Sequence, residues 1–388
     1  MDTEVSGRAG KRESRGKPSL VSSPAPLLPC SPAPSPRIVQ LTPPGRGAIA
    51  TVLIEGPGAV EMVATHFQPK SGQPLSEYSG RQLVFGTFGS DPGEEIVVRC
   101  RSQESVELHC HGGHAAVEAI VETLVQQGGQ STAWQDWAAG QYEDPIAAAA
   151  RVALAEARTE RTAAILLDQY QGALRRVLGE IERELQGAKP QAAVKLIDEL
   201  LQRADLGLHL KKPWRVVIGG RPNVGKSSLM NALVGYERVI IHPASGTTRD
   251  AVAVTTAMDG WPVELCDTAG LRSSGDPLEV AAVERANRQL GEADLVVLVF
   301  DESQPWSEAD DALLRAWPEA LVVHNKSDLA PGGGRRPPGT ATSALRGEGI
   351  ETLTAEIVRR LVPQPLPPGA AVPFTEDQIE RLRVMKHS

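Results

Sequence analysis

A glycine-rich segment, GRPNVGKS, runs from Gly220 to Ser227 and matches the pattern GxxxxGK[ST]. It follows an apolar strand-like segment, WRVVIGG, and precedes a helical pattern, which is the context that a phosphate-binding loop (P-loop) requires. Gly220 and Gly225 let backbone N–H groups face phosphate oxygens, and the helix start adds a favourable dipole. We expect Lys226 to reach the β- and γ-phosphates and the Ser227 hydroxyl to ligate Mg²⁺. The segment alone predicts a nucleoside triphosphate site without selecting the base.

Two further segments predict metal and γ-phosphate contacts. DTAG (Asp267 to Gly270) ends the predicted strand VELCD about 40 residues after the P-loop. A carboxylate at that place suits a direct or indirect Mg²⁺ role, and the N–H of Gly270 can sense the γ-phosphate. GTTRD (residues 246–250) lies between the two motifs, and Thr248 is placed to bind Mg²⁺ when the γ-phosphate is present. The alternative for GTTRD is a plain glycine-led turn.

The base is indicated by NKSD, which spans residues 325–328 and follows the predicted strand ALVVHN. The Asp328 carboxylate can accept two hydrogen bonds from the ring N–H and amine of guanine, a pair that adenine does not offer. We expect Asn325 and Lys326 to brace this loop, and TSA (residues 342–344) to contact the guanine oxygen through backbone N–H groups. A surface turn is the alternative, but the order of the motifs favours a GTP site. The candidate nucleotide-binding residues are Gly220, Asn223, Val224, Gly225, Lys226, Ser227, Ser228, Gly246, Thr247, Thr248, Asp267, Gly270, Asn325, Lys326, Asp328, Ser343 and Ala344.

The elements that must position these motifs alternate between strands and helices. The strand segments VELCD, DLVVLVFD and ALVVHN are separated by helices expected to begin at Lys226 and near Leu278, Glu308 and Ile350. This order predicts an α/β domain over residues 212–361, with a mainly parallel sheet and helices on both faces.

Two other regions precede this domain. Residues 37–130 combine short alternating strands (RIVQL, AIATVLIEG, 81–88, 95–100 and 105–110) with a helix over 115–127, which predicts a small α+β domain. Residues 131–211 read as helical, with one apolar stripe from Leu166 to Leu185 on a helix ended by Pro190, and another helix over 192–204. A proline-rich linker within 362–388 leads to a last helix over 375–386. The chain is therefore predicted to be multidomain.

Composition narrows the remaining possibilities. The net charge of −8 argues against a wholly basic nucleic-acid binder, and no apolar run approaches the length of a membrane span. The four cysteines are scattered, which favours neither a disulfide framework nor a zinc site and makes a reducing, cytoplasmic setting the expectation. Residues 1–36 are rich in Ser, Pro and Arg and are expected to be a disordered tail; a targeting segment is the alternative.

The motif series GRPNVGKSSLMNAL, GTTRD, DTAGLR, NKSD and TSA resembles the TrmE–Era–EngA branch of GTPases. Residues 42–57 and 106–128 resemble the N-terminal folate-binding domain of the MnmE (TrmE) family, and 166–181 resemble its helical domain. The resemblance covers about residues 37–360. It implies that the GTPase domain is inserted between two segments of the helical domain, the second one short.

The resemblance also implies how this chain replaces a missing group. Leu271 stands where Ras-like proteins carry the glutamine that orients water, and leucine cannot do so. Members of the MnmE family use K⁺ as a fixed positive charge, hydrolyse GTP as dimers, and carry a P-loop asparagine ligand that matches Asn223. The loop that closes over this ion maps to about residues 241–247. Their catalytic glutamate matches Glu279; a plain helix-start acid is the alternative for that residue.

The family further implies a tRNA-modifying role. Its N-terminal domain dimerises and binds a formyl-tetrahydrofolate, for which Arg46 is a weak candidate contact. With an MnmG-like flavoprotein, family members modify the wobble uridine of tRNA. His109, His111 and His114 lie close in sequence, but no fitting ligand set accompanies them, so strand-end and turn histidines are the better interpretation.

The chain departs from the family pattern near its last residues. The family ends in a CxGK motif whose cysteine is tied to the tRNA chemistry, and no cysteine follows Cys266 here. Three interpretations stay open: an MnmE-type GTPase active on tRNA, a paralogous GTPase switch or binding module that lost the modification step, and a ribosome-assembly GTPase. The N-terminal domain argues against the third.

Overall fold

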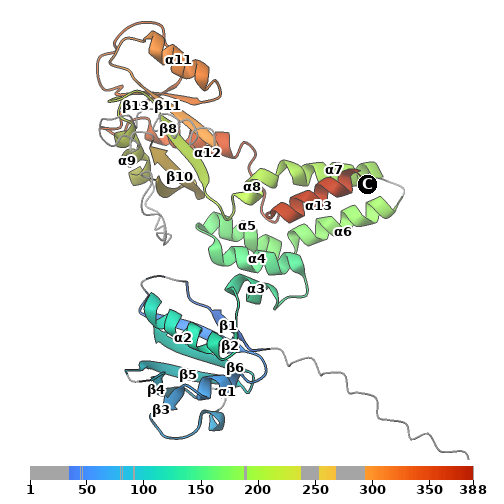
Figure 1. Cartoon of the computed structure of the whole chain (residues 1–388). Helices are drawn as coiled ribbons and strands as arrows, with labels where there is room; N and C mark the ends of the chain where they lie inside the picture. The colour runs from blue at the N-terminus through green and yellow to red at the C-terminus, as the bar shows by residue number, and fades with distance from the viewer. Residues whose placement is uncertain are drawn as a thin grey trace, which may run out of the picture.

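The protein is described by a computed structural model that covers residues 35–43, 45, 47–78, 80, 82–90, 92–187, 190–236, 253–267 and 293–387. Figure 1 shows an N-terminal mixed sheet, a group of helices beside it, and a second sheet with its own helices. Within the described residues, no helix is both long enough and apolar enough to cross a bilayer.

The N-terminal sheet is antiparallel except at one edge, where β1 and β7 run parallel. Its strands, in spatial order, are β3 (Phe67–Pro69), β4 (Val84–Phe88), β5 (Glu94–Ser102), β6 (Ser105–His111), β2 (Ile49–Glu55), β1 (Arg37–Gln40) and β7 (Gln130–Ser131). The sequence of β6 explains its place, because Val106, Leu108 and Cys110 alternate with more exposed residues and face the core. Helices α1 (Ala59–Ala64) and α2 (His114–Gln126), together with the short 3₁₀ turn η1 (Leu75–Glu77), complete this core.

The helical region contains more and shorter helices than the sequence predicted. They are α3 (Trp134–Ala139), α4 (Pro145–Glu156), α5 (Glu160–Tyr170), α6 (Ala173–Gln186), α7 (Pro190–Gln202) and α8 (Ala204–Leu208). The expectation of one helix carrying the stripe from Leu166 to Leu185 was wrong. Helix α5 ends at Tyr170, and α6 begins at Ala173. Gly172 between them has a left-handed φ of 93°, which interrupts the α-helical path, so α5 and α6 are separate helices.

The second sheet has the predicted, mainly parallel arrangement. Its strands, in spatial order, are β13 (Thr340–Thr342), β12 (Leu321–Asn325), β11 (Leu295–Asp301), β8 (Trp214–Gly219), β10 (Trp261–Asp267) and β9 (Ala253–Met258). Only β9, at one edge, pairs antiparallel among the described strands. Helices α9 (Lys226–Tyr236), α11 (Glu308–Ala316) and α12 (Ile350–Leu361) begin where the sequence predicted. Because carboxyl ends of parallel strands share one edge of a sheet, the motifs that follow β8, β10 and β12 converge there.

The proline-rich segment 363–373, named the strap here, is packed and hydrogen-bonded along the helices. Buried Gln169 of α5 donates to the carbonyl of Ala370 at 3.0 Å and accepts from the N–H of Val372 at 3.1 Å. Arg203 donates to the carbonyl of Ala371 at 3.0 Å. The strap delivers helix α13 (Glu376–His387) onto α7, where Lys386 pairs with Asp198 at 2.7 Å. Figure 1 shows this last helix, in red, among the green helices.

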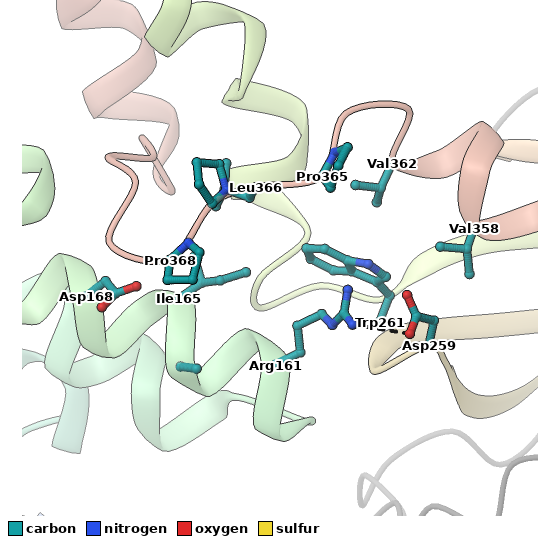
Figure 2. A pocket seen from close by; sticks show the side chains of 12 residues that line it. Arg161, Ile165, Asp168, Asp259, Trp261, Val358, Val362, Pro365, Leu366 and Pro368 are labelled. Atoms are coloured by element: carbon teal, nitrogen blue, oxygen red, sulfur yellow. Dashed lines mark hydrogen bonds and ion pairs between the residues drawn. The ribbon is translucent and has the colours of Figure 1, made fainter. Parts of the chain in front are cut away.

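A cavity of about 360 Å³ lies where α5, the strap and the β9–β10 turn meet. Figure 2 shows Arg161 of α5 beside Asp259 and the Trp261 ring, with prolines of the strap on another side. The Arg161 guanidinium pairs with Asp259 at 3.2 Å and lies 5.5 Å from the centre of the Trp261 ring. The β9–β10 turn, which belongs to the second sheet, therefore touches the helical region directly.

Candidate GTP-binding site

The P-loop has the backbone that a phosphate cradle needs. Gly220 has φ 146° and Gly225 has φ 94°, both positive. A Cβ on Gly220 would collide with the Val299 carbonyl, and one on Gly225 would collide with the Asn325 amide. Asn223 also has a positive φ, of 64°, although it has a side chain. Larger residues at the two glycines would fill the loop or push it away from its neighbours.

Lys226 and Ser227, which we predicted to face phosphate and Mg²⁺, are the first two residues of α9. The Ser227 hydroxyl donates to Asp267 Oδ2 at 2.6 Å, which joins the P-loop to the end of β10. Lys226 is 6% exposed, and its Nζ donates to the Arg221 carbonyl at 2.8 Å. A hydroxyl and a carboxylate side by side are hard oxygen donors of the kind that Mg²⁺ prefers. These residues therefore fit a magnesium–phosphate group.

Asn325 connects the base motif to the P-loop. It is 2% exposed, and its side-chain amide donates to the Val224 carbonyl at 2.9 Å. Its Oδ1 accepts from the Ala344 N–H at 3.1 Å and from the Thr342 hydroxyl at 3.3 Å. One buried amide of NKSD thus binds both the P-loop and TSA. This is the bracing role that the sequence predicted for Asn325.

Asp328 is held by the TSA segment. Its side chain is 8% exposed, and its Oδ1 accepts from the hydroxyl of buried Ser343 at 2.7 Å. Ser343 Oγ also accepts from the N–H of Arg346 at 3.2 Å, which fixes the direction of the hydroxyl. A carboxylate oriented in advance suits recognition of two neighbouring N–H groups.

The structure adds Asp301, which the sequence analysis did not select. It is the last residue of β11 and pairs in register with Asn325. Its Oδ2 lies 2.6 Å from Lys326 Nζ, and that ammonium also donates to the Asn223 carbonyl at 2.7 Å. A signal was present in the sequence, because the strand DLVVLVFD ends in a carboxylate at the edge where the other motifs converge.

Several predicted residues lie outside the described part of the chain. They are Arg46, Gly246, Thr247, Thr248, Gly270, Leu271 and Glu279. The remaining predicted nucleotide contacts come together around the carboxyl ends of β8, β10 and β12.

His109 and His111 of β6 and His114 of α2 each contact another side chain of the N-terminal region. His109 bonds the Thr51 hydroxyl at 3.1 Å, His111 pairs with Glu94, and His114 pairs with Glu118 at 3.2 Å. Over the residues that the structure describes, no group of three or more His, Cys, Asp or Glu is arranged to hold a metal ion.

Comparisons with known proteins match both sheets. The family model "GTP-binding protein TrmE N-terminus" matches residues 38–135, and "50S ribosome-binding GTPase" matches 215–326. Two similar relatives are tRNA modification GTPases MnmE. That of Chloroflexus aurantiacus is 34% identical and covers 84% of this chain and 81% of its own length. The MnmE of a Thermus thermophilus strain is 33% identical, and the match covers 88% of this chain and 85% of the relative.

A solved structure, the G domain of the T. maritima FeoB iron transporter, is 29% identical, with a TM-score of 0.29. It covers 38% of this chain and 98% of its own. The MnmE relatives extend over the N-terminal sheet, the helices and the P-loop region together. The chain belongs to the MnmE family of tRNA modification GTPases.

Proposed function

We propose that this chain binds GTP and hydrolyses it to GDP and phosphate, and that it acts in tRNA modification. The observation that carries the GTP assignment is the oriented carboxylate of Asp328, braced by Ser343 beside a P-loop. ATP offers no N–H pair at the matching ring positions, so this carboxylate selects guanine.

The described residues supply phosphate binding. Backbone N–H groups between Gly220 and Lys226 surround phosphate oxygens, and the Lys226 ammonium exchanges its bond to the Arg221 carbonyl for one to phosphate. Ser227 and Asp267 would hold Mg²⁺, and Thr248 would join them in the GTP state. Bound Mg²⁺ neutralises charge that builds up on the phosphates.

We propose that hydrolysis is stimulated by K⁺ and depends on dimerisation. By its match to the family's catalytic glutamate, Glu279 would orient the water that Leu271 cannot, and Asn223 would ligate K⁺ with help from residues 241–247. The support is the position of Asn223, which is exposed in the P-loop and has a left-handed backbone at φ 64°. A fixed cation would stabilise the charge of the transition state without an arginine finger.

We further propose a division of labour along the chain. Residues 37–130 form the dimerising, folate-type domain, for which Arg46 is a candidate formyl-tetrahydrofolate contact. Residues 131–211 and the helix within 362–388 form one helical domain, into which the GTPase domain at 212–361 is inserted. The contact of α13 with α7 supports this arrangement.

We propose that tRNA and an MnmG-like flavoprotein are the partners, and that the wobble uridine is the site of modification. A reducing, cytoplasmic setting remains our expectation. It is supported by free, buried thiols at Cys100, Cys110 and Cys266.

Base selection is tested with Asp328→Asn. An amide can donate to the C2 carbonyl of xanthine but no longer accepts both guanine N–H groups, so turnover should shift from GTP to XTP. Retained GTP preference in the variant would show that Asp328 does not read the base.

The cation is tested by comparing GTP turnover in KCl and NaCl at equal ionic strength. Asn223→Ala should remove the stimulation by K⁺ with GDP binding nearly intact, and Glu279→Ala should lower turnover with little change in nucleotide affinity. Equal turnover of the unaltered protein in both salts would exclude the K⁺ mechanism.

The tRNA role is tested by deleting the gene and measuring wobble-uridine modification by mass spectrometry. Loss of the modification, restored by the intact gene, is the expected result. Unchanged tRNA in the deletion strain would contradict the proposed role in modification.

A further inference from the structure

Asp301 has both carboxylate oxygens committed to defined partners. Oδ1 accepts from the N–H of Ser303 at 2.9 Å and from its hydroxyl at 2.6 Å. This leaves Oδ2 facing Lys326 Nζ at 2.6 Å, with the Asp301 side chain only 11% exposed. A carboxylate bound on one side in this way cannot rotate freely, so it fixes the position of the ammonium on its other side.

The ion pair is not needed to join the two strands. Backbone pairing already sets Asp301 opposite Asn325, and the N–H of Glu302 donates to the Asn325 carbonyl at 2.8 Å. The side chain of Asp301 instead fixes the position of the Lys326 ammonium. That ammonium also donates to the Asn223 carbonyl at 2.7 Å. The pair therefore reaches from the base motif to the P-loop.

Both ends of this connection have an unfavourable backbone. Lys326 has φ 68° and Asn223 has φ 64°, in the left-handed region that residues with a side chain adopt at a cost. Such conformations persist where surrounding contacts hold them. The ammonium touches both places, since it belongs to Lys326 and binds the carbonyl of Asn223.

We propose that Asp301 is a positioning residue which, through Lys326, holds Asn223 in its cation-binding conformation and so couples the guanine site to the cation site. This inference rests on the proposed role of Asn223 as a K⁺ ligand. The Asp301 carboxylate touches neither nucleotide nor ion; it acts through the lysine. Without it, Lys326 keeps its charge but loses its fixed position, and the P-loop carbonyl loses its donor.

The test uses the full chain with Asp301→Asn, which keeps the size of the side chain and removes its charge. GTP turnover is measured against KCl at constant ionic strength, and GDP affinity is measured by titration. We expect the K⁺ concentration for half-maximal turnover to rise at least about fivefold, the lower end of coupling between two sites. GDP affinity should fall as well, whereas kcat at saturating K⁺ and GTP should stay within about twofold.

Asp198→Asn is the matched control, because it removes an ion pair of similar length, 2.7 Å to Lys386, between α7 and α13. Its K⁺ response should equal that of the unaltered protein. Should Asp301→Asn fail to fold, Ser303→Ala decides on the same readout, since it loosens the carboxylate but keeps its charge. A shift of about twofold in the same direction is expected there.

An unchanged K⁺ midpoint in a folded Asp301→Asn variant overturns the inference, as does a loss of GDP affinity without any K⁺ shift. Failure of the proposed cation role is seen separately, because the unaltered protein would then show no K⁺ dependence at all. A K⁺-dependent parent with an unaffected variant contradicts the inference alone.

Discussion

Replacing Ser343 by alanine should weaken GDP binding by a predictable amount. Ser343 is fully buried, and its hydroxyl donates to Asp328 Oδ1 at 2.7 Å. The hydroxyl also accepts from the N–H of Arg346 at 3.2 Å. Ser343→Ala therefore removes the hydrogen bond to the base-reading carboxylate and leaves the N–H of Arg346 without this acceptor.

The two effects have different sizes. Losing a hydrogen bond to a charged group costs about 1.5–3 kcal/mol of folding stability. Binding suffers less, because GDP can still meet the Asp328 carboxylate after one side chain is ordered again. Ordering one side chain costs about 0.5–1.5 kcal/mol, which corresponds to an increase in Kd of about 2- to 13-fold.

The assay is a GDP titration of the variant together with urea unfolding of the nucleotide-free protein. Ser327→Ala is a control in the same loop, since Ser327 donates its backbone N–H to Thr342 and that bond survives the change. A GDP affinity equal to that of the unaltered protein, in a variant with lowered stability, would refute the view that Ser343 prepares Asp328 for the base.

Three further changes test contacts made by the helical region with the strap and with the second sheet. Gly207→Ala would drive a Cβ into the Pro373 carbonyl, so we expect at least about 2 kcal/mol loss of stability by urea unfolding. Burial alone would raise the pKa of Asp294, but hydrogen bonds from His209 and a backbone N–H outweigh it and lower the pKa. Its contribution to stability is therefore full above about pH 4 and lost as pH falls through the lowered pKa, so the stability difference caused by Asp294→Asn should shrink in that acid range. Arg161→Ala removes an exposed ion pair and an aromatic contact and should cost about 0.5–1.5 kcal/mol, measured as a shift in the unfolding midpoint.

Much of the GTPase region could be predicted because its signals are local. The starts of α9, α11 and α12 follow from helix-start patterns, and the strand ends follow from apolar segments that stop at polar residues. Asn325 was expected to brace the base loop, and it bonds to the P-loop and to TSA. Motif order on a parallel sheet is enough for this, since the topology brings the strand ends together.

Other features depend on contacts that a single sequence does not display. The helix break at Gly172 was missed because the apolar spacing continues through it, and a lone glycine is tolerated in many helices. Asp301 was overlooked because its partner Lys326 lies 25 residues away, directly after the neighbouring strand β12. The strap was expected to be a linker because it is rich in proline. Its sequence does not show that the side chain of Gln169 hydrogen-bonds to its backbone.

The strap also limits how the GTPase region can move relative to the helices. The chain enters that region from α8 and leaves it through the strap, and both crossings are anchored on the same group of helices. A body attached at two points keeps one easy rotation, about the line that joins them, whereas a body attached at one point can swivel in any direction. The contact of Arg161 with the β9–β10 turn is a third attachment, made by side chains (Figure 2). Breaking it would remove one restraint on that rotation while leaving both covalent crossings in place.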